Sequence, residues 1–355
     1  MLEKMGSWFG THRYLDRLGG LQPMLTVLIT GGAGYIGSHV VYSFLDAGYK
    51  VVVVDDLSTG LRANLPTAVP LYKGNIADRE LLDAILGQHR IDGVLHFAAS
   101  TVVPESLEDP AKYYRNNAYR SLELVDFLIT RGVKRFLFSS SAAVYGIPAN
   151  ATPVSETSLL NPISPYGWSK LFVERMIRDI SAASGLNYGI LRYFNAAGSD
   201  PKGRTGQSTP HATHLMKVAC EVAAGKRDGM HIYGTDYDTP DGTCVRDFIH
   251  VTDLAQAHVA TYEFVARSGR NACFNCGSGN GHSVLQVIRA VEQARGRKLE
   301  VEAAARRPGD AAALLADASA NRKTVGWRPR YDLADMVRTA LAWERREQRD
   351  LIEVP

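Results

Sequence analysis

The sequence contains only four cysteines in 355 residues, too few for a disulfide framework in a chain of this length. Cys273 and Cys276 form a single CxxC pair, with no second pair or histidine at the spacing of zinc ligands. We interpret this pair as two small apolar residues at the end of a buried strand. His211 and His214 lack the glutamate of an HExxH motif, so we assign no metal site.

The sequence also lacks a long apolar run and a marked excess of either charge. No segment approaches the ~18 apolar residues of a membrane-spanning helix. Forty Lys and Arg residues against 37 Asp and Glu residues give a net charge of +3, too small to argue for nucleic acid or an anionic membrane. A hydrophobic content of 45% with 22% charged residues is typical of a globular enzyme, and the length is sufficient for two domains.

The first 24 residues have no continuous apolar core of the kind found in a signal peptide. We expect residues 1–24 to be a disordered extension, or the result of a start codon chosen upstream of Met24. Nothing in this segment supports a targeting role, and we expect a cytoplasmic protein.

What the sequence does contain is a glycine-rich turn at GxxGxxG spacing, formed by Gly31, Gly34 and Gly37. The turn follows residues 25–30, whose apolar run predicts a buried strand, and precedes residues 38–47, whose pattern predicts a helix. Glycines at these positions permit a tight turn and let the backbone approach a pyrophosphate at the helix N-terminus. We therefore predict a dinucleotide-binding site.

An acidic residue at the end of the next predicted strand, residues 50–55, supports this prediction. Asp55 lies 18 residues after Gly37, close to the ~20 expected for a carboxylate that binds the cofactor ribose. Asp55 and Asp56 together would repel a 2′-phosphate, which favours NAD over NADP.

A tyrosine and a lysine four residues apart, Tyr166 and Lys170, follow Pro165, a residue suited to the first turn of a helix. On a helix the two side chains share a face. A tyrosine titrates near ~10, and a neighbouring cation favours the phenolate and lowers that pKa. Alone, such a pair more often means a packed ring and a solvated charge. Beside a dinucleotide site, it indicates proton transfer.

Strand and helix signals alternate through the first half of the chain, which predicts an α/β fold with a Rossmann-type doubly wound parallel sheet. Ligands of such sheets bind at the carboxyl ends of the strands. We predict an NAD-binding domain over residues 25–196 and a smaller mixed α/β substrate domain over residues 197–355, some of whose elements can pack back on the first. The further strands expected are 71–75, 93–97, 134–140 and 187–194, the helices are 78–88, 111–131 and 166–184, and the long loops 198–210 and 236–242 are expected to bind ligands.

Seven motifs between about residue 25 and residue 344 resemble those of the extended short-chain dehydrogenase/reductase family. The last two are particular to its nucleotide-sugar 4-epimerases. The motifs are TGGAGYIGSH at 30–39, HFAA at 96–99, FSSSAAVYG at 138–146, SPYGWSK at 164–170, RYFN at 192–195, DGTCVRDFIHV at 241–251 and RRPGD at 306–310.

The resemblance implies an NAD-dependent isomerase that interconverts UDP-galactose and UDP-glucose through a 4-keto sugar. A 4-epimerase of UDP-N-acetylglucosamine, UDP-glucuronate or a UDP-pentose is the alternative among enzymes, and a non-catalytic NAD-sensing protein is the alternative outside them. A 4,6-dehydratase is disfavoured because Ala142 and Ala143 stand where sequences of that group carry an Asp-Glu pair. The resemblance also implies a homodimer formed by helices 111–131 and 166–184.

Three catalytic positions are implied by the same resemblance. Tyr166 would take the proton from the sugar 4-hydroxyl, Lys170 would lower the pKa of Tyr166 and hold the nicotinamide ribose, and Ser141 would hydrogen-bond the reacting oxygen. For Ser141, a simple backbone-capping role is the alternative. The cofactor-binding positions implied are Gly31, Gly34, Tyr35, Ile36, Gly37, Asp55, Asp56, Asn75, Ile76, Phe97, Ala98, Ala99, Asn117, Tyr166, Lys170 and Tyr193.

The substrate positions implied include two arginines, because a guanidinium is suited to clamp a diphosphate. Arg246 could instead form a structural pair with Asp247, and Tyr233, expected to stack on uracil, could be a core aromatic. The full set is Ser141, Tyr166, Asn195, His214, Leu215, Tyr233, Arg246, Arg307 and Asp310.

The sequence departs from the family pattern at four positions. Asn75 replaces an aspartate that contacts adenine, Thr101 replaces a lysine beside the cofactor phosphates, and Ala143 replaces a threonine that contacts the sugar. Leu314 stands where family members carry either a bulky tyrosine or a small residue that admits an N-acetyl group. The tolerance for N-acetylated sugars therefore stays open.

Overall fold

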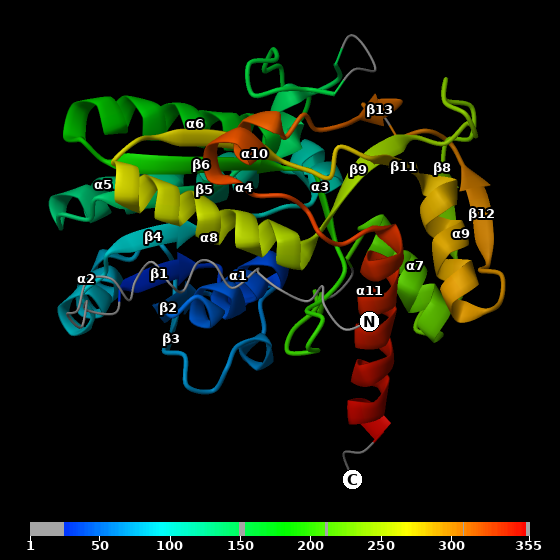
Figure 1. Cartoon of the computed structure of the whole chain (residues 1–355), viewed down its shortest axis with the longest axis horizontal. Coiled ribbons are helices and arrows are strands. Elements are labelled where there is room, and N and C mark those ends of the chain that lie inside the picture. The colour runs from blue at the N-terminus through cyan, green and yellow to red at the C-terminus, as the bar shows by residue number, and fades with distance from the viewer. Residues whose placement is uncertain (1–24, 149–152, 210–211, 308, 353–355) are drawn as a thin grey trace, which may run out of the picture.

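The computed structural model of the chain describes residues 25–148, 153–209, 212–307 and 309–352. Predictions for residues 1–24 and for His211 lie outside the described residues. Within them, seven parallel strands form a central sheet in the order β10-β6-β5-β4-β1-β2-β3 (Figure 1). The strands are β1 (Thr26–Thr30), β2 (Lys50–Asp55), β3 (Leu71–Lys73), β4 (Gly93–His96), β5 (Arg135–Ser139), β6 (Asn187–Tyr193) and β10 (Ala272–Cys276). The predicted doubly wound sheet is confirmed.

Alternate side chains of each strand point to opposite faces of the sheet, and both faces are covered by helices. Val27 and Ile29 of β1 pack in the core beneath α1 (Tyr35–Asp46) and α8 (Val251–Ser268). Leu28 packs in the core on the other face. That face is covered by α2 (Arg79–Gln88), α5 (Arg120–Thr130) and α6 (Pro165–Ser184).

The helix predicted over residues 111–131 is wrong in detail. Its range holds most of the short helix α4 (Pro110–Tyr113), then a π-helical turn η3 (Tyr114–Tyr119) and then α5. The extra residue per turn of a π-helix has no local sequence signal. Such turns are frequent at functional sites. The remaining short elements of this half are α3 (Val103–Glu108) and the 3₁₀ turns η2 (Arg62–Asn64) and η4 (Ala142–Tyr145).

The second half of the chain builds a smaller mixed α/β unit with its own core. One small sheet follows the order β11-β9-β13, with β7 also paired to β9, and a second pairs β12 with β8. The strands are β7 (Asn195–Ala197), β8 (Met230–Tyr233), β9 (Val245–His250), β11 (Gly281–Ser283), β12 (Val301–Ala304) and β13 (Ala313–Leu314), and the helices are α7 (Leu215–Ala224), α9 (Val284–Arg295), α10 (Ser319–Val325) and α11 (Leu333–Ile352).

The chain passes between the two units more than once. It leaves the large sheet after β6, builds β7 to β9, and returns through α8 and β10, which lie on and in the large sheet. A single boundary at residue 197 therefore marks only the first of these crossings.

The loop predicted over residues 198–210 packs against the helix that follows the glycine turn. Tyr35 donates to the Gly198 carbonyl oxygen at 2.7 Å, and the hydroxyls of Ser38 and Thr205 are 2.8 Å apart. Arg204 bridges Asp46 of α1 and Asp200 of the loop. These contacts tie the second unit to the helix whose N-terminus faces the predicted cofactor.

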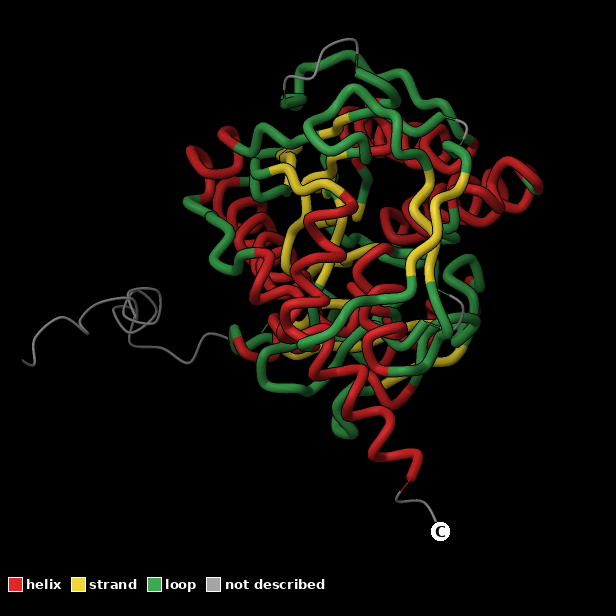
Figure 2. Tube along the Cα trace, turned by 90° about the vertical axis from the view of Figure 1, so that its right-hand side faces the viewer, coloured by secondary structure: helices red, strands yellow, loops and turns green. Residues whose placement is uncertain are grey.

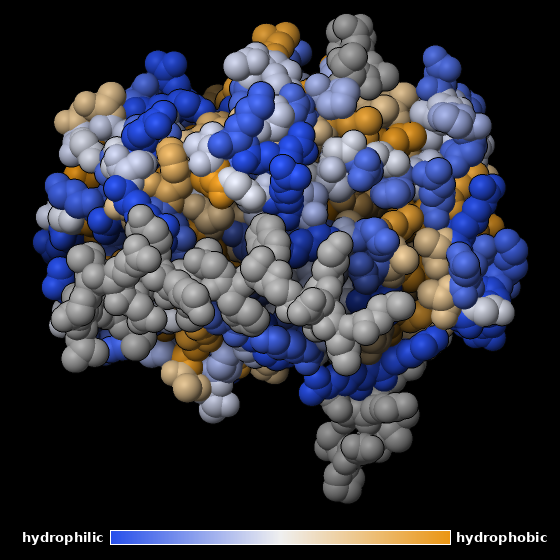
Figure 3. All heavy atoms as spheres, viewed as in Figure 1, coloured by the Kyte–Doolittle hydropathy of each residue, from blue (hydrophilic) through white to orange (hydrophobic). Residues whose placement is uncertain are grey.

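The first half of helix α11 packs in the core of the second unit, and its C-terminal end projects from the body of the molecule, as both views show (Figures 1 and 2). The face in Figure 3 carries many hydrophilic side chains between smaller apolar groups. Among the described residues, no helix combines the length and apolar character needed to cross a membrane.

Candidate active site

The glycine turn lies between β1 and α1, as predicted. Gly31 has a φ of +67° and a Cβ there would stand 2.6 Å from the Ala98 nitrogen, while a Cβ at Gly37 would overlap the Gly31 carbonyl oxygen. Gly34 is the residue before α1, and it provides no side-chain cap for the first helical N–H groups. The turn therefore presents bare backbone at a helix N-terminus, an arrangement suited to a pyrophosphate.

Asp55 ends β2 and folds back over this turn. Its two carboxylate oxygens accept from the backbone N–H groups of Ala33 and Leu57, each at 2.9 Å, and the side chain is buried. Burial raises its pKa, against the lowering effect of these two hydrogen bonds. Asp56 is exposed and accepts from Ser58. Asp55 thus shapes the turn as well as standing at the predicted ribose position.

The other residues predicted at the cofactor follow neighbouring strands on the same edge. Asn75 and Ile76 come after β3, where the Asn75 side chain accepts from Ala77 N–H and Ile76 is buried in the core. Phe97, Ala98 and Ala99 follow β4, and the Phe97 N–H donates to the Thr30 carbonyl oxygen. Tyr35 and Ile36 begin α1.

Asn117, predicted near the cofactor, acts in the structure as a clamp. Its side-chain oxygen accepts from the Ser100 N–H at 2.8 Å, and its amide donates to the Ser100 carbonyl at 2.9 Å and to the Ser169 hydroxyl at 3.1 Å. The π-helical turn thereby joins the loop after β4 to helix α6.

Helix α6 begins at Pro165, and the Ser164 hydroxyl caps it by accepting from the Gly167 N–H at 3.2 Å. This start places Tyr166 and Lys170 on the buried face of the helix. Tyr166 hydrogen-bonds Ser141, which follows β5. Ser141 also accepts from the Ala143 N–H at 3.2 Å, so it caps η4 and contacts Tyr166 at once.

The predicted effect of Lys170 on Tyr166 is not found. Burial raises the pKa of Tyr166, and the opposing effect comes from the Ser141 hydrogen bond rather than from Lys170. The Lys170 Nζ lies 5.9 Å from the Tyr166 ring centre and donates to the Ser139 carbonyl at 2.9 Å. Burial lowers the pKa of Lys170 to about 7, while Glu174 acts to raise it. Burial thus raises the pKa of Tyr166 and lowers the pKa of its neighbour Lys170.

Tyr193 ends β6 beside this pair. Its phenol oxygen accepts from the Ser139 hydroxyl at 2.9 Å. Burial raises its pKa, which keeps the group neutral. Tyr193 is therefore a neutral neighbour of Tyr166 and Ser139.

Arg246 and Asp310, predicted on the substrate, are brought together although they lie 64 residues apart. The Arg246 Nη2 is 3.3 Å from Asp310, and its Nη1 donates to the carbonyls of Val245 and Ala311. The alternative pairing of Arg246 with Asp247 is wrong, because Asp247 accepts from Ser278, Gly279 and Ala316 instead.

Tyr233 ends β8, and its ring is 37% exposed. The Arg307 guanidinium lies 3.8 Å from the ring centre. Tyr233 is thus not a core residue. Its ring and the Arg307 guanidinium, both predicted to contact the substrate nucleotide, are neighbours.

The remaining substrate candidates lie at the junction of the two units. Asn195 starts β7 and pairs with Phe248, while His214 and Leu215 stand at the start of α7. His214 Nδ1 lies 2.8 Å from the Gln207 side-chain nitrogen. Among the described residues, no group of three His, Cys, Asp or Glu side chains is arranged to hold a metal ion.

Two contacts connect the second unit with η4 and with the start of helix α6. Leu314 packs against the cluster of Val144, Tyr145 and Phe194 beside η4. A Cβ at Gly309 would stand 2.9 Å from the Ile163 side chain, two residues before α6 begins. Arg246 pairs in register with Leu314, so it lies on the strand next to a residue that packs beside η4.

Of the positions that depart from the family pattern, Thr101 is exposed after β4, and Ala143 lies within η4.

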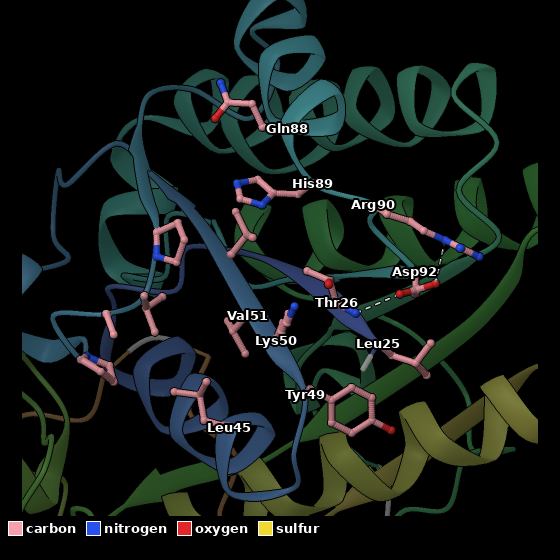
Figure 4. A pocket seen from close by; sticks show the side chains of 15 residues that line it. Leu25, Thr26, Leu45, Tyr49, Lys50, Val51, Gln88, His89, Arg90 and Asp92 are labelled. Carbon is pink, nitrogen blue, oxygen red and sulfur yellow. Dashed lines mark hydrogen bonds and ion pairs between the residues drawn. The ribbon is translucent and has the colours of Figure 1, made fainter. Parts of the chain in front are cut away.

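A separate cavity of about 670 Å³ lies at the opposite edge of the large sheet (Figure 4). It is lined by the starts of β1 and β2 and by the segment before β4, including Lys50, Tyr49, His89 and Asp92. None of the predicted site residues lines this cavity.

Sequence reasoning missed the buried polar residues behind Tyr166 and Lys170, above all Glu174 and Ser140. Glu174 accepts from the Ser140 hydroxyl at 2.6 Å. A usable signal existed, because Glu174 lies four residues beyond Lys170 and so shares the face of Tyr166 and Lys170.

Comparison with known proteins gives consistent matches. The model of the NAD dependent epimerase/dehydratase family matches residues 27–277. A UDP-glucose 4-epimerase of Azospirillum brasilense is 53% identical over 320 residues, covering 90% of this chain and 92% of that protein.

Solved structures agree. The UDP-glucose 4-epimerase from Bifidobacterium longum in complex with NAD+ and UDP is 38% identical with a TM-score of 0.87, covering 91% of this chain and 99% of that one. The UDP-Glc/GlcNAc 4-epimerase from Campylobacter jejuni is 43% identical with a TM-score of 0.79, covering 91% and 99%.

Proposed function

Since this chain belongs to the NAD dependent epimerase/dehydratase family, we propose that it interconverts UDP-galactose and UDP-glucose with NAD as its cofactor. The observation that carries the proposal is the placement of Tyr166, Ser141 and Lys170 at the edge of the sheet that also holds the glycine turn. Proton-transfer groups and a dinucleotide turn at one edge serve a reaction that moves a proton and a hydride together.

The residues present fit NAD. The backbone at Gly31 and Gly37 leaves no room for a Cβ, and the α1 N-terminus has no side-chain cap, so its N–H groups remain for the pyrophosphate. Asp55 stands at the ribose position at the end of β2. When bound, NAD+ accepts the hydride from C4 of the sugar and supplies it again.

The protein's own part of the reaction is the movement of one proton. Tyr166 takes the proton of the sugar 4-hydroxyl as the C4–H bond breaks and the 4-keto group forms, and it returns that proton when the hydride comes back. Ser141, which forms a hydrogen bond with Tyr166, is placed to form a second hydrogen bond with the oxygen at C4 of the sugar. Lys170 lies behind the pair, held by the Ser139 carbonyl.

The second unit holds the nucleotide while the sugar changes face. Arg246 and Arg307 supply the positive charges that bind the diphosphate. Asp310 binds the ribose, and the Tyr233 ring stacks on the uracil. Asn195, His214 and Leu215 stand at the start of β7 and of α7, on the same side of the junction. Anchoring through UDP leaves the keto sugar free to turn between the two hydride transfers.

The size of the sugar that fits is set in part by Leu314. This leucine is half-buried against Val144, Tyr145 and Phe194, and it is smaller than tyrosine. The similarity to the UDP-Glc/GlcNAc 4-epimerase keeps UDP-N-acetylglucosamine as the second candidate substrate.

The test is conversion of UDP-galactose by the purified chain without added NAD, beside UDP-N-acetylgalactosamine. We expect UDP-glucose to form, because the cofactor is regenerated in each cycle and has no need to leave. Comparable conversion of both sugars would widen the substrate range to N-acetylated sugars. Conversion of neither, even with NAD supplied, would reject the proposal in favour of a glucuronate or pentose substrate, or an NAD sensor.

We further propose that two copies of the chain associate through η3, α5 and α6. An apolar cleft of about 420 Å³ on this surface is lined by Tyr114, Ala118, Tyr119, Phe172, Arg175 and Met176. Phe172, Tyr119 and Leu122 are large side chains that stay substantially exposed here. A second copy would cover them. The cytoplasmic location expected from the sequence stays a prediction.

A further inference from the structure

The end of β5 carries three serines, and one face of α6 contacts each of them differently. Lys170 donates to the Ser139 carbonyl at 2.9 Å, Glu174 accepts from the Ser140 hydroxyl at 2.6 Å, and Tyr166 bonds Ser141. Tyr166, Lys170 and Glu174 are four residues apart, so they form one row on the helix. Their partners are consecutive residues, so a shift at Ser140 would move both neighbours.

Glu174 is itself held by a buried arginine of β6. Its two oxygens accept from Arg192 Nε at 2.9 Å and Nη2 at 2.6 Å, and both side chains are almost completely buried. Arg192 also donates to the Tyr145 hydroxyl at 3.1 Å and the Glu156 carbonyl at 3.2 Å. A two-pronged pair with these added bonds fixes the carboxylate in one orientation.

A buried ion pair is weak evidence for stability, because removing two charges from water offsets much of their attraction. Its position behind Tyr166 and Lys170 points to another role. Resting on the proposed function, we propose that Glu174, oriented by Arg192, is a positioning residue for the proposed epimerisation. It holds Ser140 and thereby places the Ser139 carbonyl for Lys170 and the Ser141 hydroxyl for Tyr166.

The charge of Glu174 adds a second effect on the same lysine. Around Lys170 stand Tyr166 and Glu174 on its own helix, the Phe138 ring and Ser139 carbonyl of β5, and His96 of β4. Burial lowers the pKa of His96 to about 3, so His96 is neutral near pH 7. Glu174 is thus the group that favours the charged form of Lys170.

The experiment compares Glu174→Gln with Ser140→Ala in the full chain. Glutamine keeps the shape but loses the charge, and Ser140→Ala removes only the hydroxyl that Glu174 holds. We expect both variants to bind NAD and keep the wild-type KM, because neither residue is placed on substrate. We expect kcat to fall on the order of a hundredfold, since small misplacements of reacting groups cost about that much.

The pH profile separates the two effects. Loss of the carboxylate charge favours neutral Lys170, so the alkaline limb of kcat moves to lower pH in Glu174→Gln and stays in place in Ser140→Ala. The matched control is Glu344→Gln, which removes a charge from a buried pair with Lys217 in the second unit, at 2.6 Å. We expect it to lower thermal stability while leaving kcat unchanged.

Wild-type kcat in Glu174→Gln with an unshifted profile would overturn the inference, as would an equal loss of kcat in Glu344→Gln. A measurement without substrate keeps it testable if the wild-type chain converts no UDP-sugar. The carbon-13 NMR signal of Lys170 Cε, assigned by its loss in Lys170→Met, should titrate at lower pH in Glu174→Gln. An unchanged titration would refute the role of Glu174, whereas an inactive wild-type chain would refute only the proposed function.

Discussion

Tyr166 is a buried phenol whose pKa is raised by burial, so its neighbours must stabilise the phenolate if it is to act as a base. A neutral phenol is a poor base, so the proton transfer requires a charge or hydrogen bond that favours the phenolate. Ser141 already provides one such bond, while Lys170 lies 5.9 Å from the ring centre and bonds Ser139. The effect that opposes burial at Tyr166 is therefore that of Ser141, while Lys170 is held at the Ser139 carbonyl.

The first prediction concerns the Tyr166 hydroxyl. Tyr166→Phe should fold and bind NAD, and kcat for UDP-galactose should fall by about 10²- to 10⁴-fold, the usual contribution of a proton-transfer group. The matched control is Tyr113→Phe, which removes a buried hydroxyl 2.6 Å from the Val102 carbonyl, on a ring that packs edge-on against Tyr166. Steady-state kinetics and NAD content check both, and near-normal kcat in Tyr166→Phe would reject the assignment of the base.

For single residues, the sequence predicted which side chains share a face of a helix, but it did not predict their tertiary contacts. The spacing of Tyr166 and Lys170 placed both on one face of a helix, where they are found. Lys170 donates to the backbone carbonyl of Ser139 at the end of β5. Every residue has such a carbonyl, so the residue type does not predict which one accepts the bond. The predicted direction of the Tyr166 pKa was wrong for the same reason, since burial depends on the packed fold.

At the scale of elements, the glycine turn is held by contacts that tolerate no side chain. A Cβ at Gly37 would overlap the Gly31 carbonyl oxygen and stand 2.9 Å from the Gly32 Cα. Both obstacles are backbone, so the turn itself must open to accept it. Asp55 adds two hydrogen bonds to the turn and the segment after β2, which couple the shape of the turn to the strand.

We predict from this that Gly37→Ala loses NAD. The opened turn should no longer align its N–H groups with the pyrophosphate, so NAD affinity should fall by at least about tenfold, or ~1.4 kcal/mol. Gly87→Ala in α2 is the control, because nothing stands within 4 Å of its Cβ position. Alanine there should raise stability by up to ~1 kcal/mol through helix propensity. Calorimetric NAD titration and thermal unfolding test both, and unchanged affinity in Gly37→Ala would contradict the role of the turn.

Element boundaries were predictable where caps and periodicity agreed. Residues 50–55 form β2 as expected, and Ser164 with Pro165 marks the start of α6. The π-helical turn at Tyr114–Tyr119 was not predicted, and the contacts it makes are tertiary. Its Asn117 side chain bonds Ser100 and Ser169, two segments far away in the sequence.

For the whole molecule, the arrangement of the second half was beyond local signals. Arg246 and Asp310 meet because β9 and β13 are paired, with Arg246 opposite Leu314. Tyr233 meets Arg307 because β8 pairs with β12. Short strands joined by long loops carry weak periodicity, so such pairings depend on the packed structure rather than on any one segment.

The inward and outward faces of α6 carry different residues, so the proposed dimer can be tested separately from the proposed catalytic groups. Tyr166, Lys170 and Glu174 point inward, whereas Phe172 is 44% exposed on the outer face beside Trp168 and Tyr114. We expect Phe172→Asp to convert a dimer to a monomer, because a charge buried in an apolar interface is strongly unfavourable. Leu159→Asp is the control, since Leu159 is 82% exposed outside this surface.

Size-exclusion chromatography with light scattering at micromolar concentration measures the outcome. A monomeric wild-type chain, or a Phe172→Asp variant that stays dimeric, would contradict the proposed interface. Because the introduced carboxylate would lie away from the inward row, the monomer should keep bound NAD. If dissociation nevertheless abolishes kcat, we infer that loss of the partner changes the position of Tyr166, Lys170 or Glu174 on the inward face of α6. The pH profile of the residual activity would then reveal whether Lys170 or the placement of Ser141 has changed.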